Sequence, residues 1–205
     1  MPDLDVRRVF DRFAHLYDTG WLQRALYVGV QDLALAELRA LRPASVVDVG
    51  CGTGIFAARL AQELAPAAVA GCDLSSGMLA QAAARSRRVG WVQADSARLP
   101  LRSGAVDVVV CTQAFHFFDQ PAAWREFRRV LAPGGHALVG MFNPRTDAAS
   151  RHIGRLSSAA TWPTREAMAR LATDAGFEVV AQPEAQWRMR RLSPLVLTVG
   201  RVPGA

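Results

Sequence analysis

The chain has 205 residues, of which 51% are hydrophobic and 20% charged, a composition typical of a globular protein rather than a disordered one. This length suits one α/β domain with a full core and is short for two. No apolar run is long enough to cross a bilayer. The formal net charge of +6 raises a separate question, because a basic protein can bind nucleic acid.

The basic character comes entirely from arginine, because all 24 basic residues are arginines. Arg125, Arg128 and Arg129 recur at helical spacing, which is typical of a solvated helix face. The abundance of alanine and arginine without lysine indicates a coding bias, so we expect nucleic acid not to be a partner. Arg188 and Arg190 share a face of a predicted strand, where they would form one small basic patch whose role the sequence does not assign.

The cysteines Cys51, Cys72 and Cys111 form no CxxC pair, and no histidine or fourth cysteine completes a coordination set. We therefore expect small buried side chains near strand ends, with no disulfide framework and no metal site. The first five residues carry acids without an apolar core, which is unlike a secretory signal and favours a cytoplasmic protein.

The first part of the chain predicts helices followed by a strand. Apolar residues recur at helical spacing over residues 4–41, with a break at Thr19 and Gly20. Pro43 ends this region, and residues 46–49 have the apolar character of a buried strand. They run into a turn over residues 50–54 with glycine at alternate positions, after which a helix pattern begins.

A strand, a glycine turn and a helix N-terminus together are typical of a nucleotide-type cofactor site at the carboxyl edge of a parallel sheet. Glycine lets a ligand approach the main chain, and the helix points free N–H groups at that ligand. The turn alone does not identify the cofactor, since Gly52, Gly54 and Ala57 also fit the relaxed G-x-G-x-x-G/A pattern of NAD(P) sites.

Strands and helices then alternate along the chain. Strands are predicted over 69–73, 90–94, 106–111 and 136–142, with helices over 76–85 and from Asp119 to the Pro-Gly-Gly turn at 133–135. An irregular stretch over 143–163 is followed by a helix from Thr164 to Gly176 and by an antiparallel pair over 177–189 and 192–202 with a tight connection. This pattern predicts one α/β domain with helices on both sheet faces.

Acidic residues follow two successive predicted strands. Asp73 ends the second strand, and Asp95 follows the third. A carboxylate at the position of Asp73 can accept hydrogen bonds from both hydroxyls of a ribose. Two such acids after a glycine turn favour a cofactor pocket over a purely structural role.

These segments resemble the class I S-adenosylmethionine-dependent methyltransferases, most of all the branch of ubiquinone/menaquinone-biosynthesis and related small-molecule methyltransferases. Residues 47–54, 73–79 and 94–101 resemble the first three motifs of that family, and 131–135 its helix-to-strand turn. Residues 10–14 and 17–18 resemble its N-terminal segment.

The resemblance implies a Rossmann-like α/β fold, with a seven-stranded, mostly parallel sheet, an antiparallel terminal strand and helices on both faces. It implies a single methyltransferase domain over residues 1–205. Within it, 1–44 would form a helical lid, 45–142 the cofactor-binding core, and 143–205 the acceptor-side segment and terminal strand pair. It also favours S-adenosylmethionine over NAD(P), because some 44 residues of helix precede the first strand.

The resemblance assigns roles by position. The glycine turn would lie under the methionine part of the cofactor, Asp73 would hold the ribose, and Asp95 would accept a hydrogen bond from the adenine amine. The predicted cofactor residues are Asp48, Gly50, Cys51, Gly52, Gly54, Asp73, Leu74, Met78, Asp95, Ser96, Thr112 and Gln113.

Catalytic residues are harder to assign, because the cofactor already supplies an activated methyl group and the protein mainly aligns it and excludes water. His116 is the best-placed base if the acceptor must lose a proton. The alternative is a ring packed among the neighbouring phenylalanines that only shapes the pocket. Tyr17 is a weaker base candidate and fits a lid contact better.

The acceptor is predicted to be small and partly apolar. Methyltransferases of nucleobase amines or glutamine amides usually carry an Asn/Asp-Pro-Pro-aromatic run after the fourth strand, whereas residues 112–115 read Thr-Gln-Ala-Phe. The segment 143–163 is also short for an RNA-reading domain. An RNA or other nucleic-acid methyltransferase and a non-catalytic S-adenosylmethionine-binding protein remain as alternatives. The oligomeric state is open between monomer and homodimer.

Overall fold

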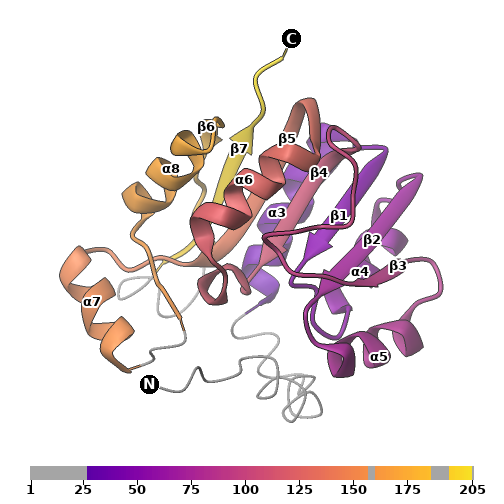
Figure 1. Cartoon of the computed structure of the whole chain (residues 1–205), viewed down its shortest axis with the longest axis horizontal. Coiled ribbons are helices and arrows are strands. Elements are labelled where there is room, and N and C mark those ends of the chain that lie inside the picture. The colour runs from indigo at the N-terminus through magenta and orange to yellow at the C-terminus, as the bar shows by residue number, and fades with distance from the viewer. Residues whose placement is uncertain (1–26, 157–159, 186–193, 205) are drawn as a thin grey trace.

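The computed structural model describes residues 27–156, 160–185 and 194–204. Within these ranges the strands form a seven-stranded sheet in the order β3-β2-β1-β4-β5-β7-β6 (Figure 1). The strands are β1 (Ser45–Val49), β2 (Ala68–Asp73), β3 (Gly90–Gln93), β4 (Val106–Thr112), β5 (Leu131–Phe142), β6 (Glu178–Ala181) and β7 (Leu195–Arg201).

Strands β1 to β5 pair in parallel, and β7 lies antiparallel between β5 and β6. This topology confirms the predicted Rossmann-like fold with its antiparallel terminal strand. It also places the carboxyl ends of β1, β2 and β4 at one edge of the sheet.

Helices cover both faces of the sheet (Figure 1). Helices α6 (Gln120–Val130) and α8 (Arg165–Asp174) pack on one face, and α3 (Val28–Leu41) and α4 (Ile55–Glu63) pack on the other. The apolar run over residues 108–111 of β4 follows from this arrangement, because Val109 and Cys111 enter one core while Val108 and Val110 enter the other. Helix α5 (Ser76–Arg85) follows β2 and lies beside β3.

Side-chain caps fix where three helices begin. The Ser75 hydroxyl accepts a hydrogen bond from Met78 N at 3.1 Å in α5. Asp119 accepts from Ala122 N at 3.1 Å in α6, and Thr164 accepts from Ala167 N at 3.2 Å in α8. These caps satisfy donors that the first helical turn leaves free, and they confirm the helix starts predicted at Asp119 and Thr164.

The N-terminal helical prediction can be assessed only from residue 27 onward. Helix α3 ends at Leu41, where Arg42 takes a left-handed φ of 49° and its N–H donates to Leu38 O. The predicted break at Thr19 and Gly20, and Tyr17 with it, lie outside the described residues. Among the described helices, none is both long and apolar enough to cross a bilayer.

The fifth strand starts earlier than predicted. We expected the 133–135 turn to end α6, but α6 ends at Val130 and β5 begins at Leu131. Leu131 pairs with Val106, and the register then shifts along the strand. The turn is therefore an irregularity within β5, where a proline without an N–H and a φ of 77° at Gly134 are tolerated.

Two further predictions over the last third of the chain are wrong. The irregular stretch contains helix α7 (Asp147–Leu156), at whose start Thr146 Oγ1 accepts a hydrogen bond from Ala149 N at 3.1 Å. Strand β6 ends at Ala181 instead of residue 189, and Pro183 cannot donate to a ladder. The predicted tight connection and the Arg188–Arg190 patch fall within 186–193, outside the described residues.

Candidate functional site

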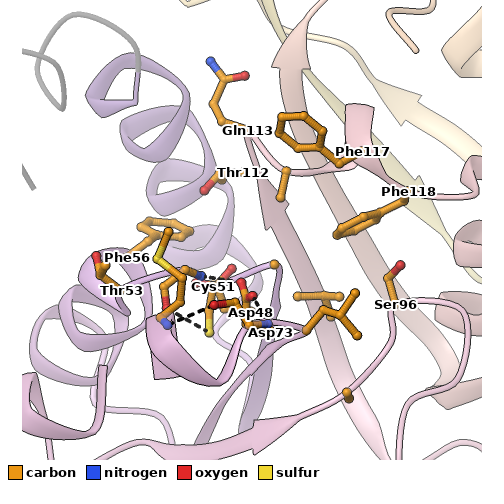
Figure 2. A pocket seen from close by; sticks show the side chains of 18 of the residues that line it. Asp48, Cys51, Thr53, Phe56, Asp73, Ser96, Thr112, Gln113, Phe117 and Phe118 are labelled. Carbon is orange, nitrogen blue, oxygen red and sulfur yellow. Dashed lines mark hydrogen bonds between the residues drawn. The ribbon is translucent and has the colours of Figure 1, made fainter. Parts of the chain in front are cut away.

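A cavity of about 410 Å³ opens at the carboxyl edge of the sheet. It is lined by the glycine turn after β1, the ends of β2 and β4, the loop after β3, and the first turn of α3 (Figure 2). Its position at the edge where parallel strands end is where α/β folds bind ligands.

The three glycines of the turn serve different purposes. Gly50, Gly52 and Gly54 have φ values of 73°, 53° and 76°, a region that favours glycine. A Cβ on Gly50 would collide with Ala114, and one on Gly54 with Trp91, whereas one on Gly52 would meet nothing within 4 Å. Gly52 therefore leaves an open cradle at the cavity, and Gly54 permits close packing behind it.

Asp73 fastens this turn to the end of β2. Its Oδ2 accepts a hydrogen bond from Gly52 N at 2.8 Å, and its Oδ1 accepts from Ser75 N at 2.9 Å. The carboxylate thus holds the backbone on both sides of the cavity floor while it still lines the cavity (Figure 2).

Asp48 is the most unusual charged group of the site. It lines the cavity but is 1% exposed, and no described residue places a donor at normal hydrogen-bonding distance from either carboxylate oxygen. Burial, reinforced by the charge of Asp73, raises its pKa from 3.8 to about 7, with an opposing smaller effect from Ala57 N–H. A buried carboxylate without a counter-charge favours a positively charged ligand.

The loop after β3 forms the next part of the cavity. Asp95 is exposed at the rim, where its Oδ1 accepts a hydrogen bond from Ala97 N at 2.9 Å, and Ser96 is buried beside it. Glu126 of α6 anchors the same loop by accepting from Leu99 N at 2.6 Å. Arg129 lowers the pKa of Glu126 and donates to Leu99 O at 3.1 Å.

Most predicted cofactor residues come together at this cavity. Leu74 and Met78, for which the resemblance implies packing against the adenine, both line it, with Leu74 47% exposed and Met78 buried. Gly54 does not line it. The predicted residues that do are Asp48, Gly50, Cys51, Gly52, Asp73, Leu74, Met78, Asp95, Ser96, Thr112 and Gln113.

His116 lies in the short 3-10 helix η1 (Phe115–Phe117) and is not among the residues that line the cavity. Its ring stacks on Trp162 with the ring centroids 3.9 Å apart and the ring planes 17° apart, and its centroid lies 4.0 Å from that of Phe117. Burial lowers its pKa to about 3. These features argue against the general-base role and favour packing, the alternative that the sequence left open.

The three cysteines are free and buried, as expected. Burial and the nearby carboxylates raise the thiol pKa values of all three, so they remain neutral small side chains. Among the described residues, no group of His, Cys, Asp or Glu side chains is arranged to hold a metal ion.

The cavity also includes residues that were not assigned to it from the sequence. Tyr27 and Gln31 contribute from the start of α3, and Phe56 from α4. Gln31 is only 5% exposed and shares the buried helix face with Leu35 and Leu38. A glutamine in a stripe of apolar residues was the signal that could have found it.

Comparison with known proteins shows that this chain is similar to methyltransferases. A model of the methyltransferase domain matches residues 47–139. A malonyl-acyl-carrier-protein O-methyltransferase of Geobacter sulfurreducens is 37% identical over 146 residues, which are 69% of this chain and 54% of the relative. A ubiquinone/menaquinone biosynthesis C-methyltransferase of Syntrophotalea carbinolica is 33% identical over 155 residues, which are 71% of this chain and 65% of the relative.

The chain thus spans about half the length of the malonyl-acyl-carrier-protein O-methyltransferases that it matches. A chain from the complex of the Haloferax volcanii Trm112 methyltransferase activator with a methyltransferase gives a TM-score of 0.79. That match covers 95% of this chain and 97% of the other at 23% identity, and it shows the fold.

Proposed function

Because the chain belongs to the class I S-adenosylmethionine-dependent methyltransferases, we propose that it binds S-adenosylmethionine at this cavity and transfers its methyl group to a small, partly apolar acceptor. The observation that carries the proposal is the buried, uncompensated carboxylate of Asp48 beside the open cradle at Gly52. A cofactor with a positively charged amino group and sulfonium is the kind of ligand that such a site stabilises.

The residues present suit the parts of this cofactor. Asp48 would offer the counter-charge to its amino group, and Asp73 would accept hydrogen bonds from its ribose. Asp95 and Ser96 lie where the resemblance expects the adenine amine, and Met78 supplies an apolar contact. When bound, S-adenosylmethionine supplies a methyl group that is already activated for in-line displacement.

The chain itself would contribute alignment and exclusion of water. Phe117 and Phe118 also line the cavity, with the Phe118 ring close to Gly50, and their rings would exclude water from an acceptor (Figure 2). Because His116 is stacked and outside the cavity lining, we assign it no proton transfer. An acceptor that needs no base, or one that loses its proton to solvent, fits this arrangement.

The small acceptor is supported by the relative named as a ubiquinone/menaquinone biosynthesis C-methyltransferase. The other relative is named for a malonyl group carried on an acyl-carrier protein, which is a small acceptor group on a protein. The absence of an Asn/Asp-Pro-Pro-aromatic run at residues 112–115 argues against nucleobase amines. A cytoplasmic location is part of the same proposal, because free buried cysteines suit a reducing compartment.

Binding of S-adenosylhomocysteine, measured by calorimetry, tests the cofactor assignment. Asp73→Ala should weaken it by about 10- to 100-fold, since it removes charge-assisted hydrogen bonds. Asp174→Ala, at an exposed acid near the end of α8, is the matched control and should change nothing. Unchanged affinity in Asp73→Ala would contradict the ribose role.

Transfer of a labelled methyl group to fractions of a cell extract, followed by mass identification of the product, tests the activity. A labelled small molecule is the expected product. Binding of S-adenosylhomocysteine without any labelled product would favour a non-catalytic binding protein, and labelled RNA with strongly salt-dependent binding would favour a nucleic-acid methyltransferase.

A further inference from the structure

One wall of the cavity, formed by the start of α3 and the segment that follows β4, has its own chemistry. It combines the uncharged polar groups of Gln31, Thr112 and Gln113 with the rings of Phe117 and Phe118, and the Phe118 ring also lies close to Gly50 of the glycine turn. Asp48 and Asp73 lie at the end of the cavity away from Gln113 (Figure 2). Among the described residues that line the cavity there is no arginine or histidine.

Asp119, a carboxylate beside these aromatic residues, also lines the cavity. Asp119 follows Phe118, and its Oδ1 caps α6 by accepting the hydrogen bond from Ala122 N. Thr112 and Gln113 are 8% and 4% exposed. An anion placed against this wall would therefore lose its hydration without gaining a counter-charge, which is strongly unfavourable.

Gly140 of β5 brings the two polar parts of the wall together. A Cβ at Gly140 would collide with Val30, so the absence of a side chain lets α3 approach the sheet at the residue before Gln31. The carbonyl of Gly140 also accepts a hydrogen bond from Gln113 N at 2.7 Å. This bond supports a φ of 57° at Gln113, which is uncommon for a residue other than glycine and is found at functional sites.

Gln31 has an unmet hydrogen-bonding capacity. Its side chain is 5% exposed and lines the cavity, and within the described part of the chain its amide has no hydrogen-bond partner. Its amide atoms are not among the buried side-chain atoms that lack a partner, so the amide faces the cavity, where a ligand could complete its hydrogen bonds. An amide offers both a donor and an acceptor without charge, so it matches an uncharged oxygen or nitrogen.

We propose that Gln31, together with Thr112, binds the methyl acceptor by hydrogen-bonding an uncharged polar group on a flat, mostly apolar molecule whose ring lies against Phe117 and Phe118. Gln31 is then a specificity-determining residue that selects hydroxylated or carbonyl-bearing rings over both purely apolar rings and anions. The inference rests on the proposed function, because it concerns the acceptor half of the same cavity.

Binding of three matched naphthalenes to the full chain saturated with S-adenosylhomocysteine tests the proposal. 2-Naphthol offers an uncharged hydroxyl, 2-methylnaphthalene offers none, and 2-naphthoate carries a negative charge. We expect 2-naphthol to bind most tightly and 2-naphthoate most weakly. Gln31→Leu should reduce the preference for 2-naphthol over 2-methylnaphthalene by about three- to tenfold, the worth of one neutral hydrogen bond.

Gln31→Met, which keeps the length of the side chain, is measured in parallel in case the leucine variant does not fold. Both variants should bind S-adenosylhomocysteine like the wild type, which also reports that they are folded. Gln62→Leu, at an exposed glutamine of α4, is the control and should leave the preference unchanged.

Tight binding of 2-naphthoate would overturn the proposal, as would a failure of all three naphthalenes to bind. An unaltered preference in folded Gln31→Leu or Gln31→Met would overturn the role of Gln31. A wild-type chain that does not bind S-adenosylhomocysteine would instead refute the proposed function, so the two failures are distinguishable.

Discussion

Replacing Asp48 by asparagine should stabilise the unliganded protein at alkaline pH. Asp48 is 1% exposed, and burial together with Asp73 raises its pKa from 3.8 to about 7. Because the folded-state pKa lies above the unfolded value, the folded chain retains a proton that the unfolded chain releases as the pH rises between these values. The cost of ionising Asp48 is therefore absent below the unfolded pKa and complete above the folded one.

The size of this cost follows from the pKa change. A rise of this extent lowers the free energy of unfolding by about 4 kcal/mol at about pH 8 and by about 1 to 2 kcal/mol at about pH 5. An asparagine at the same position also lacks partners, but that penalty does not vary with pH. The free energy of unfolding of Asp48→Asn, relative to that of the wild type, should therefore rise by about 2 to 3 kcal/mol from about pH 5 to about pH 8.

Urea unfolding of the wild type, Asp48→Asn and the exposed-acid control Asp174→Asn, followed by circular dichroism at both pH values, measures this difference. The control should show none. If the free-energy difference between Asp48→Asn and the wild type is the same at both pH values, or falls at the higher one, the assignment of a strained carboxylate to Asp48 is refuted.

Three further results are expected from the same features. Binding of S-adenosylhomocysteine should strengthen by about tenfold between about pH 6 and pH 8 as Asp48 ionises, and calorimetry of Asp48→Asn should show that this dependence is lost. His116→Phe should preserve turnover within a few-fold and leave the pH–rate profile unchanged, because the ring stacks on Trp162; a large loss of turnover in a folded variant would restore the base role. Gly140→Ala should destabilise the protein by about 1 to 3 kcal/mol, since its methyl group collides with Val30, and urea unfolding that shows no loss would contradict the close approach of α3.

The sheet and its functional edge were predictable because their signals are local. Strand β4 is buried on both faces and is therefore an almost continuous apolar run, broken only by Asp107 before Val108, and the helices after it begin at capping residues such as Asp119 and Thr164. The glycine turn follows β1, Asp73 is the last residue of β2, and Asp95 lies two residues after β3. Their meeting at one cavity then follows from parallel topology.

What was missed depends on partners that are distant in the chain. The early start of β5 is set by pairing of Leu131 with Val106. The sequence offered both a base role and a packing role for His116, and its stacking partner Trp162, which favours packing, is 46 residues away in the chain. Neither partner can be recognised from the residue pattern alone. The lid role of residues 1–44 and the contact assigned to Tyr17 stay predictions.

The instability at Asp48 and the affinity proposed for the site are two effects of one interaction. A positively charged group bound beside Asp48 would recover the cost of ionising it, which is about 4 kcal/mol or roughly a thousandfold in binding constant. Asp73 differs, because Gly52 N and Ser75 N already compensate its charge and make it part of the turn. Loss of Asp73 should therefore destabilise the turn and weaken binding of the ligand. Loss of the Asp48 charge should instead weaken binding while it stabilises the unliganded protein.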